Sequence, residues 1–547
     1  MTLNASGPVS LGGSTTGQSV NLELGQSATA QVSFNDASVR VLTNTTTGSS
    51  VAMPQDFWGQ TYFAPASAYL YTSTFSSGDP DSQFIPSGQV TDSSGNTYIA
   101  GTYYGAPSPN SFAAIVKINR FGVIQWQKYI SGFAFETYGF SQGTGTAQVK
   151  IGLDSSNNLY IGFYCTGSVG ATDRGPGVIK LDSNGTVLWC RQLAPTVVSP
   201  PYDYGLTCGA LVGTSGTVFT AGVGQVSGTT TAWIATLDTS GNFLSKSNID
   251  LFYISGFVLD SSDNIYLHGY TNQSLYGYTY SVATVIKLNS SLTIQWQKYY
   301  TVTATGYPNE NCMMPSGTAL AVADSGDLYL GGAVNYYRGS GPPYYYGYVG
   351  AVRISSSTGS VLSATAQRVS SNYNNCTVRK VVTDSSNNVY LITASNNIDH
   401  DANSNTVSVL FKYPSGLGSV TYQYRFQGLG DGGVYGYYGS IPSSVSVIGN
   451  SLFLSGIGSI TSTPTRGATF YQLPNNGSYF GANRYFYPPA TTTGYLAPDN
   501  PGFSTDSTFA SAAGTSALST ESLSWGSLSP SVSSVTISLM TPLTTTY

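Results

Sequence analysis

The chain has 547 residues and a formal net charge of −5, from 20 Lys+Arg and 25 Asp+Glu. Charged residues make up 8% of it, against about 25% in an ordinary globular domain, while 42 residues are tyrosine and 63 are glycine. Disordered chains are poor in aromatic and β-branched residues, so this composition excludes disorder and predicts a folded protein whose surface is solvated by hydroxyls and amides.

The composition also argues against several classes of partner. No basic stripe is present, so we expect no nucleic-acid binding by phosphate neutralisation. No apolar run approaches the roughly 20 residues of a membrane span, and the start lacks the pattern of a secretory signal, so we expect no membrane insertion. Five cysteines without CxxC spacing indicate mostly reduced thiols, a protein assembled in a cytoplasm, and no zinc site.

Residues 1–60 do not repeat elsewhere in the chain and predict a small β-rich module. We expect a strand, a glycine turn and a second strand, because Val20, Leu22 and Leu24 alternate with polar residues. A short helix should follow Asp36. The inward residues of that helix are expected to be Val39, Val41 and Leu42.

This region resembles an N-terminal module of tail-fibre and other virion proteins of tailed phages, whose patterns are SGxISLG, xVxxELG, ISLNDAxVRxL and SGxISMxDFxGK. Gln60 replaces the closing lysine of the family, and four residues are inserted after Gly12. The resemblance implies attachment to other virion proteins through residues 1–60, and by analogy a location in the virion as a tail or capsid appendage. We further expect a homo-oligomer or several copies per particle. The matching segments are Ser6–Gly12, Val20–Gly25, Val32–Leu42 and Gly48–Gly59.

The next segment, SAYLYTSTF (Ser67–Phe75), precedes the first full repeat and reads as a single strand. We predict that it completes the last sheet of the repeat array and thereby pins a ring shut.

A repeat then begins at TDSSGNTYIAG (Thr91–Gly101), and its aromatic residue recurs every 47 to 63 residues. Each copy continues with short segments such as AIVKIN and VIQWQKY, which are β-branched, alternate in polarity and are separated by Ser/Gly/Asn/Asp turns. Four antiparallel strands repeated seven times predict an all-β, seven-bladed β-propeller. The seven aligned aromatic residues are Tyr98, Tyr160, Phe219, Tyr266, Tyr329, Tyr390 and Phe453.

The DSSGN segment is predicted to be the tight turn between the first two strands of a blade. Asp and Asn bond their own backbone in such turns, and Gly or Asn tolerates the left-handed conformation. The aromatic residue that follows should pack between neighbouring blades. The alternative is a calcium site, but DSSGN offers one carboxylate where calcium takes six to eight oxygen ligands. We therefore expect no bound metal.

The repeat resembles the bacterial β-propeller repeats of the SBBP type, whose pattern runs Asp, Gly-Asn, Tyr, Gly, Lys-Leu-Asp, Gly and Trp. Trp126, Trp189 and Trp296 stand at the last position of that pattern. The third copy carries Trp233 in its middle element instead, and the fifth to seventh copies lack the tryptophan. The resemblance implies a propeller fold and says little about activity.

Long segments that differ from blade to blade connect the second strand to the third and one blade to the next. In a meander all of these lie at one end of the ring, opposite the short DSSxN turns, and insertions at one end of a repeat array mark a binding face. Tyrosine with Ser, Gly and Asn suits adaptable recognition, and sugar rings fit such surfaces. Packing against neighbouring subunits is the alternative, since it also favours tyrosine. The candidate binding residues are Tyr103, Tyr104, Tyr138, Tyr202, Tyr204, Tyr276, Tyr278, Tyr336, Tyr337, Tyr344, Tyr345, Tyr346, Tyr435, Tyr437 and Tyr438.

Catalytic motifs are scarce. His268 lies inside a predicted strand and is expected to be a core residue, and His400, between Asp399 and Asp401, is expected to lie in an exposed polar loop. GLGDGG (Gly428–Gly433) matches GxGxxG without the strand and helix that a dinucleotide site requires. We therefore predict no catalytic residues, no cofactor and no enzymatic activity.

The C-terminal extension, residues 491–547, is rich in Ser and Thr, and alternation over Ser531–Met540 indicates a strand. It could close the ring, dock on the N-terminal module or pair with another subunit. The predicted domains are thus residues 1–60, the propeller over 61–490, and this extension.

These observations together predict a structural appendage of a tailed-phage virion, whose propeller displays tyrosine-rich loops for recognition of the host surface, with a glycan as the expected ligand. The alternatives are a tail, neck or capsid protein whose propeller only packs on its neighbours, and a polysaccharide-degrading enzyme.

Overall fold

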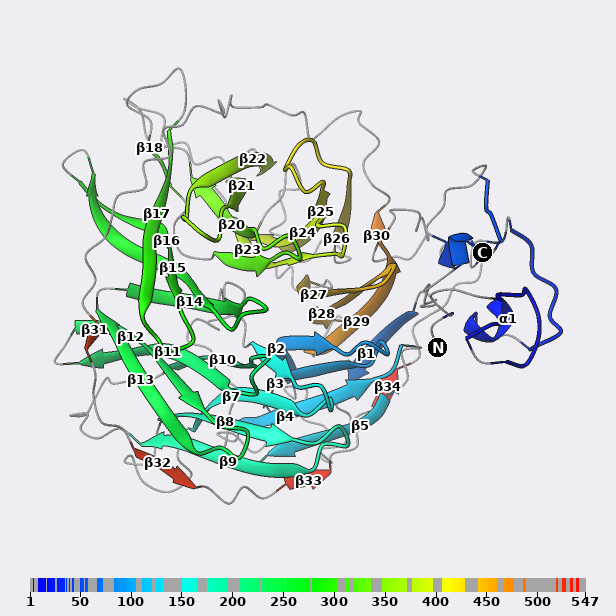
Figure 1. Cartoon of the computed structure of the whole chain (residues 1–547), viewed down its shortest axis with the longest axis horizontal. Helices are drawn as coiled ribbons and strands as arrows, with labels where there is room; N and C mark the ends of the chain where they lie inside the picture. The colour runs from blue at the N-terminus through cyan, green and yellow to red at the C-terminus, as the bar shows by residue number, and fades with distance from the viewer. Residues whose placement is uncertain are drawn as a thin grey trace.

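The computed structural model shows a ring of antiparallel sheets with a small N-terminal module beside it (Figure 1). The described strands form seven four-stranded blades, which confirms the predicted all-β propeller. Helical residues among those described are confined to the module, and no helix in the described part of the chain could span a bilayer. The structure describes residues 3, 8–15, 17–24, 27–34, 36, 39, 42–43, 50–53, 55–57, 66–71, 83–104, 111–120, 124–130, 150–165, 175–194, 206–226, 229–250, 252–275, 278–303, 311–313, 318–335, 347–370, 376–396, 406–427, 441–459, 466–475, 486–487, 518–519, 524–527, 532–534 and 538–540.

Each blade is an up-and-down meander whose first strand lies nearest the ring axis. Blade 1 is β2 (Gln83–Thr91), β3 (Thr97–Tyr104), β4 (Ser111–Ile118) and β5 (Ile124–Ile130). Blade 2 is β6 (Ile151–Leu153), β7 (Leu159–Cys165), β8 (Gly175–Leu181) and β9 (Val187–Ala194). Blade 3 is β10 (Leu206–Val212), β11 (Val218–Val226), β12 (Thr229–Leu237) and β13 (Phe243–Asp250).

The remaining blades follow the same order. A short strand, β18 (Asn311–Met313), joins blades 4 and 5 into one continuous sheet. Blade 4 is β14 (Phe252–Leu259), β15 (Ile265–Leu275), β16 (Tyr278–Leu288) and β17 (Ile294–Thr303). Blade 5 is β19 (Ala319–Val322), β20 (Leu328–Asn335), β21 (Gly347–Ile354) and β22 (Val361–Ser370). Blade 6 is β23 (Cys376–Thr383), β24 (Val389–Asn396), β25 (Thr406–Tyr413) and β26 (Tyr422–Gln427), and blade 7 has β27 (Ile441–Ile448), β28 (Ser451–Ser459) and β29 (Arg466–Pro474).

The fourth strand of blade 7 comes from the other end of the ring sequence. Strand β1 (Ala66–Tyr71) pairs antiparallel with β29, with Ala66 opposite Gln472 and Leu70 opposite Ala468. The predicted closure of the ring by this segment is therefore confirmed, with the strand starting one residue before Ser67.

The described strands of the C-terminal extension lie on the outer rim of the ring (Figure 1). Its short strands add a fifth strand to the outer edges of blades 3, 2, 1 and 7 in turn, so the chain passes them in reverse order. We call β31 to β34 the strap. The strap consists of β31 (Leu518–Ser519), β32 (Ser524–Ser527), β33 (Val532–Ser534) and β34 (Ser538–Met540), and β30 (Phe486–Tyr487) similarly pairs with β26 of blade 6.

The aligned aromatic residues form the core of the ring. All seven are completely buried, in the second strand of each blade. Tyr98, for example, packs with Ile161 and Leu181 of the next blade, and Tyr390 packs with Leu452 and Leu454. The predicted position of these residues between neighbouring blades is confirmed.

Three blade junctions add the same polar contacts to this core. Between blades 1 and 2, Trp126 Nε1 and Lys117 Nζ each donate to the Ser183 carbonyl at 3.0 Å. Lys117 Nζ also lies 5.0 Å from the centroid of the Tyr98 ring, a cation–π distance. Gly185 has a φ of +77°, and a Cβ there would lie 3.0 Å from the Trp126 indole. The corresponding residues at the other two junctions are Trp189, Lys180, Thr239 and Gly241, and Trp296, Lys287, Ser356 and Gly359.

Junctions without the tryptophan use other side chains. Ser245 and Ser363 occupy the tryptophan position in blades 3 and 5, and the facing turns carry Leu292 and Leu417, both 3% exposed. At the junction of blades 6 and 7, Tyr422 replaces the tryptophan, and its hydroxyl donates to the Asn475 carbonyl at 2.7 Å.

The N-terminal module has its own small core, built from residues such as Leu3, Val39 and Phe57. One prediction for it is wrong: Val20 to Leu24 do not form a strand, because α1 (Val20–Glu23) is a helix, capped by Ser19 Oγ accepting from the Leu22 N–H at 3.3 Å. Val39 and Leu42 are helical and buried, as predicted, while Val41 lies outside the described residues. A 3₁₀ helix, η1 (Gln55–Phe57), completes the module.

Candidate functional site

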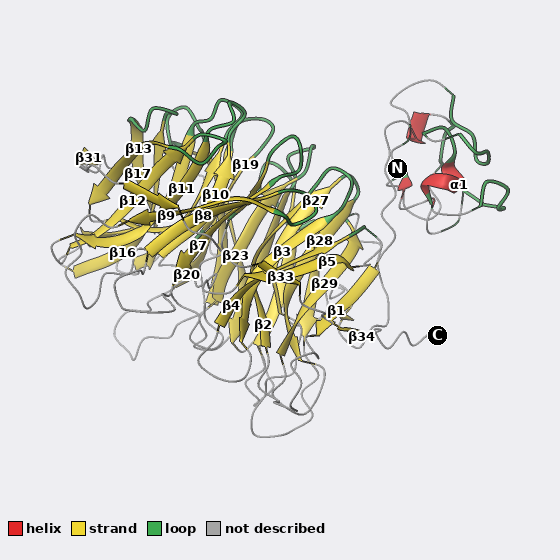
Figure 2. Ribbon diagram, turned by 90° about the horizontal axis from the view of Figure 1, so that it is seen from below, coloured by secondary structure: helices red, strands yellow, loops and turns green. Residues whose placement is uncertain are grey.

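The two ends of the ring differ in chemistry, and the first end carries the Asp turns. In Figure 2 the described turns, drawn green, gather along one edge of the ring. In the first of them, Asp92 Oδ1 accepts from the N–H groups of Ser94 and Asn96 at 3.0 and 2.8 Å, and Oδ2 accepts from Asn96 Nδ2 at 2.9 Å. This confirms that Asp and Asn bond within their own turn.

The tyrosine of the repeat completes that turn in three blades. The Tyr160 hydroxyl donates to Asp154 Oδ2 at 3.1 Å, and Tyr266 donates to Asp260 in the same way at 3.0 Å. Burial works against ionisation of Asp154 and Asp260, but hydrogen bonds from the neighbouring Asn and Tyr side chains and from the backbone hold the pKa of both carboxyls below its usual range. Asp384 and Tyr390 form the third such pair. These carboxylates are therefore occupied by the turns themselves.

The N-terminal module contacts this same end. Arg120, in the turn between β4 and β5, forms an ion pair with Glu23 of α1 at 3.3 Å, with side chains 10% and 1% exposed. Asn450, in the turn between β27 and β28, donates to the Leu42 carbonyl at 3.0 Å. Both turns belong to the end of the ring that bears the Asp turns, so the module contacts that end at blades 1 and 7.

The candidate tyrosines belong to segments that leave the opposite end. Tyr104, the last residue of β3, pairs with Ser111, the first residue of β4, so the segment between them connects the strands at the end away from Asp92. Tyr103, Tyr104 and Tyr278 lie in strands, and only their backbone is described. The other candidates lie outside the described residues: Tyr138, Tyr202, Tyr204, Tyr276, Tyr336, Tyr337, Tyr344, Tyr345, Tyr346, Tyr435, Tyr437 and Tyr438.

Blade 4 extends furthest toward that end among the described strands. Its β15 and β16 have 11 residues each and stay paired to Leu275 and Tyr278. Nearer the axis, Tyr253 of β14 stacks on Tyr270 of β15, with ring centroids 4.6 Å apart and planes 4° from parallel. Both rings are half-buried, and burial followed by the neighbouring Tyr253 raises the pKa of Tyr270. An aromatic platform of this kind suits the apolar face of a sugar ring.

The sequence prediction missed this stacked pair. Its signal was present, because FYISGF and YLHGYTN place a tyrosine in each of two adjacent strands. Recognising the pair needed the register across the bulge between Ile254 and Gly256, which sets Tyr253 opposite Tyr270.

Of the predictions for the two histidines, the structure describes only the one for His268. His268 is 2% exposed in β15, which confirms a core position, and its Nδ1 lies 3.1 Å from Thr318 Oγ1. His400, Asp399 and Asp401 lie outside the described residues, as does Gly428–Gly433. Within the described residues, no three His, Cys, Asp or Glu side chains gather as metal ligands, and Cys190 is a buried free thiol.

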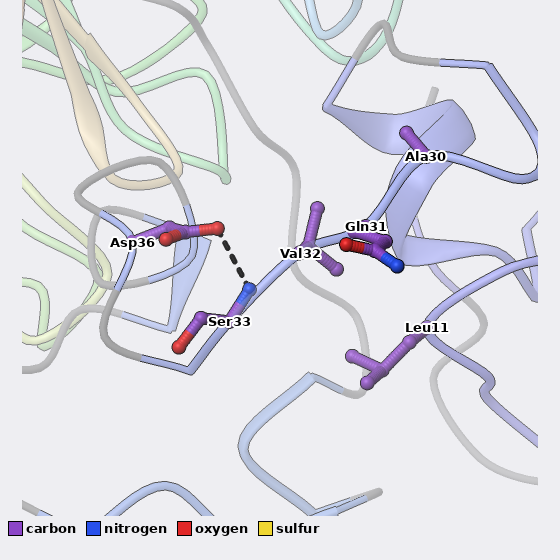
Figure 3. A pocket seen from close by; sticks show the side chains of 6 residues that line it. All are labelled: Leu11, Ala30, Gln31, Val32, Ser33 and Asp36. Atoms are coloured by element: carbon purple, nitrogen blue, oxygen red, sulfur yellow. Dashed lines mark hydrogen bonds between the residues drawn. The ribbon is translucent and has the colours of Figure 1, made fainter.

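The N-terminal module contains a surface pocket of about 510 Å³ (Figure 3). Its one charged side chain, Asp36, accepts a hydrogen bond from the Ser33 N–H at 2.7 Å, so this carboxylate shapes the loop that forms the wall. The lining residues are Leu11, Ala30, Gln31, Val32, Ser33 and Asp36.

No protein-family model and no curated sequence matches the chain. Several solved structures resemble it in fold. Polysaccharide lyase Uly1 has a TM-score of 0.42 and 10% identity, over 80% of this chain and 96% of that one. The α-L-arabinanase of Penicillium chrysogenum, complexed with arabinobiose, has a TM-score of 0.37 and 12% identity, over 75% and 98%. Xylan β-1,4-xylosidase of Bacillus halodurans C-125 has a TM-score of 0.26 and 8% identity, over 75% and 97%.

The comparison corrects one prediction. We expected a chain without enzymatic activity, and this expectation is contradicted, because the similar structures are those of a lyase, an arabinanase and a xylosidase. At these identities the likeness shows the propeller fold alone, so it assigns no reaction to this chain.

Proposed function

We propose that the chain is an appendage protein of a tailed-phage particle, attached through residues 1–60, and that the loop end of its propeller recognises a carbohydrate of the host surface. The observation that carries the proposal is the placement of the module. It contacts the Asp-turn end through Arg120 and Asn450, so the end that bears the tyrosine-rich segments is directed away from it.

The chemistry of the loop end supports a carbohydrate ligand. The stacked Tyr253 and Tyr270 offer half-buried aromatic surface beside the axis, and tyrosine provides contact area at a small cost in conformational entropy. Hydroxyl and amide groups dominate the adjoining segments, such as NYYRGSGPPYYYGY (Asn335–Tyr348), which suits neutral, hydroxyl-rich partners. The resemblance of residues 1–60 to phage virion modules supplies the expected location.

Adsorption of the purified full-length chain to host cells tests the proposal. We expect wild-type protein to bind cells and their extracted surface polysaccharide. The variant Tyr253→Ala with Tyr270→Ala should lose roughly tenfold or more in affinity, as expected for a central aromatic contact. Tyr299→Ala, which removes a half-buried tyrosine from the outermost strand of blade 4, is the matched control and should bind as wild type does.

Three outcomes of the adsorption experiment would overturn the proposal. Failure of wild-type protein to adsorb would favour a role limited to packing in the particle. Equal adsorption by all variants would move recognition away from the loop end. Release of soluble sugar fragments would replace recognition by catalysis. An image of the particle in which the module points outward and the loop end inward would also contradict it.

A further inference from the structure

The first strands of the blades surround the axis, and each contacts the first strand of the next blade. Five of them contain a bulge at the same level, for example between Ile254 and Gly256 and between Val378 and Lys380. The residue after the bulge pairs with the second residue after the repeat's aromatic, as Gly256 does with His268. The same level in the seven blades is occupied by Gly88, Lys150, Gly209, Gly256, Ala319, Lys380 and Ser444.

Two lysines therefore stand among five small residues at one level of the axis. The five small residues leave space beside the two lysines at this level. Lys150 of blade 2 bridges to Gly209 of blade 3, where the Ala210 N–H donates to the Lys150 carbonyl at 3.0 Å. Its side chain continues past blade 3 to blade 4, because a Cβ on Gly256 would lie 3.5 Å from Lys150 Cε.

His268 converges on the same point. A Cβ on Gly256 would lie 2.7 Å from His268 Nε2, so this nitrogen and the Lys150 side chain share the space above one glycine. The imidazole is 2% exposed, and Nε2 makes no hydrogen bond to any described group. When the Thr318 hydroxyl donates to Nδ1, Nε2 carries the proton and presents an N–H donor to that space.

The electrostatics around this nitrogen are entirely positive among the described groups that act on it. Burial first, then the charges of Lys150 and Lys380, hold the pKa of His268 well below its usual range, so the imidazole is neutral. Burial alone lowers the pKa of Lys380 to about 8, with no described carboxylate contributing. Lys380 and the bulged Arg379 are both intermediate in surface exposure.

We infer that His268, Lys150 and Lys380 form a binding site for a small anion, a carboxylate or a comparable oxyanion, at the propeller axis. The three residues come from blades 4, 2 and 6 and stand around one level of the axis, where His268 Nε2 and the Lys150 side chain adjoin Gly256. An anion there supplies the acceptor that His268 Nε2 lacks and is attracted by the nearby lysines in a region of low dielectric, where such contacts are strongest. The inference is independent of the proposed function, since it needs neither the loops nor the module.

Thermal melting of the full chain against acetate, at constant ionic strength, tests the site. Wild-type protein should show a saturable rise in melting temperature, since a ligand that binds only the folded state stabilises it. Lys380→Met should weaken the apparent affinity roughly tenfold or more, because it removes a charge-assisted contact. Lys298→Met, on the outermost strand of blade 4, is the matched control for loss of one positive charge and should respond as wild type does.

The role of His268 is tested by a conservative pair. His268→Gln keeps an N–H donor near the position of Nε2 and should retain most of the response, whereas His268→Leu should abolish it. Bromide diffraction of wild-type crystals requires no variant: an anomalous peak is expected within hydrogen-bonding distance of His268 Nε2. An identical acetate response in Lys380→Met and Lys298→Met, or bromide peaks elsewhere with none at the axis, would overturn the site.

Discussion

Two neighbouring junctions, between blades 2 and 3 and between blades 3 and 4, fill equivalent spaces in different ways. One places its large residue in the first blade of the pair, and the other places it in the second. In the first, Trp189 lies over Gly241, and a Cβ on that glycine would come within 2.9 Å of the indole. In the second, Ser245 stands at the tryptophan position and Leu292 at the glycine position, where it is buried in the core shared by both blades. Gly241 and Leu292 have nearly the same left-handed backbone, with φ of +81° and +61°.

The junction between blades 5 and 6 repeats the second solution, with Ser363 and with Leu417 at a φ of +56°. A large residue in one blade thus accompanies a small one in the next, in either order. The unit that the repeat preserves is therefore the junction between two blades, whose volume stays filled, rather than the motif within a single blade.

The largest loss of stability is expected when one of the two residues at a junction is replaced. Gly241→Leu should cost about 2–4 kcal/mol, because it adds left-handed strain and drives a side chain into Trp189. Gly216→Leu is the control for strain alone, since Gly216 has a φ of +83° and its nearest neighbour is the Thr239 methyl at 3.3 Å. Urea unfolding midpoints measure both.

The double variant Trp189→Ser with Gly241→Leu rebuilds the second kind of junction in place of the first. Its cost should fall short of the sum of the two single changes by at least about 1 kcal/mol, the coupling expected for residues in contact. Additive costs would show that the two kinds of junction are not interchangeable.

The next largest loss of stability is expected when the leucine is removed from the second kind of junction. Leu292→Gly should cost about 2–3 kcal/mol, because a buried leucine is lost while glycine relieves part of the left-handed strain. Leu244→Ala, at a position 55% exposed on β13, should change stability by less than about 0.5 kcal/mol. Equal effects in thermal melts would mean that Leu292 does not fill the junction.

The Asp turns should make the stability of the chain depend on pH in the acid range. The pKa of Asp154 and Asp260 is lowered in the folded state, so the unfolded chain binds more protons and stability falls as the pH drops through the usual carboxyl value of 3.8. Blades 3 and 5 carry Gly213 and Ala323 at this position. Burial opposes ionisation of Asp263 in blade 4, but hydrogen bonds from Ser215 and Thr214 of the blade 3 turn lower the pKa of that carboxyl as well. Asp154→Asn with Asp260→Asn should flatten the melting temperature between pH 5 and pH 3 relative to wild type, and an unchanged slope would contradict the assignment.

The smallest effect concerns the junction of blades 6 and 7. Tyr422→Phe should cost about 1 kcal/mol, because the Asn475 carbonyl loses one of two donors while Lys412 remains bonded to it at 2.9 Å. Tyr422→Trp should be close to wild type in a thermal melt, since the indole N–H can replace the hydroxyl. A large loss in the tryptophan variant would show that this junction does not accept the contact used at the three tryptophan junctions.

Much of the fold could be predicted because it repeats. Seven spaced aromatics and their turns fixed the number of blades, and the strand before the first repeat was recognisable as the missing strand of the last. The division into residues 1–60, 61–490 and 491–547 remains a prediction, although the strap shows that part of the extension pairs with the ring.

The misses have physical causes. Val20, Leu22 and Leu24 alternate with polar residues, as in a strand. A segment of this length also fits about one turn of helix, and the N-cap at Ser19 stabilises the helix. The role of Leu292 could not be predicted from its own blade, because its partner Ser245 belongs to the preceding repeat. Lys380 was hidden by a bulge that shifts the register of its first strand, whereas Lys150 precedes β6 and is placed at the same level by its bridge to Gly209.

Blade 7 combines strands that are synthesised far apart in time. Its closing strand, β1, is made early, yet its partner Gln472 follows Ala66 by 472 − 66 = 406 residues. At about 5–20 residues per second, the ribosome needs roughly 20–80 s to deliver that partner. Through that interval the ring stays open and β1 presents two unpaired edges. Strand β34 pairs with the second edge of β1 later still, because Ser538 follows Gln472 by 538 − 472 = 66 residues, so this strand acts as a latch on a ring that has already closed.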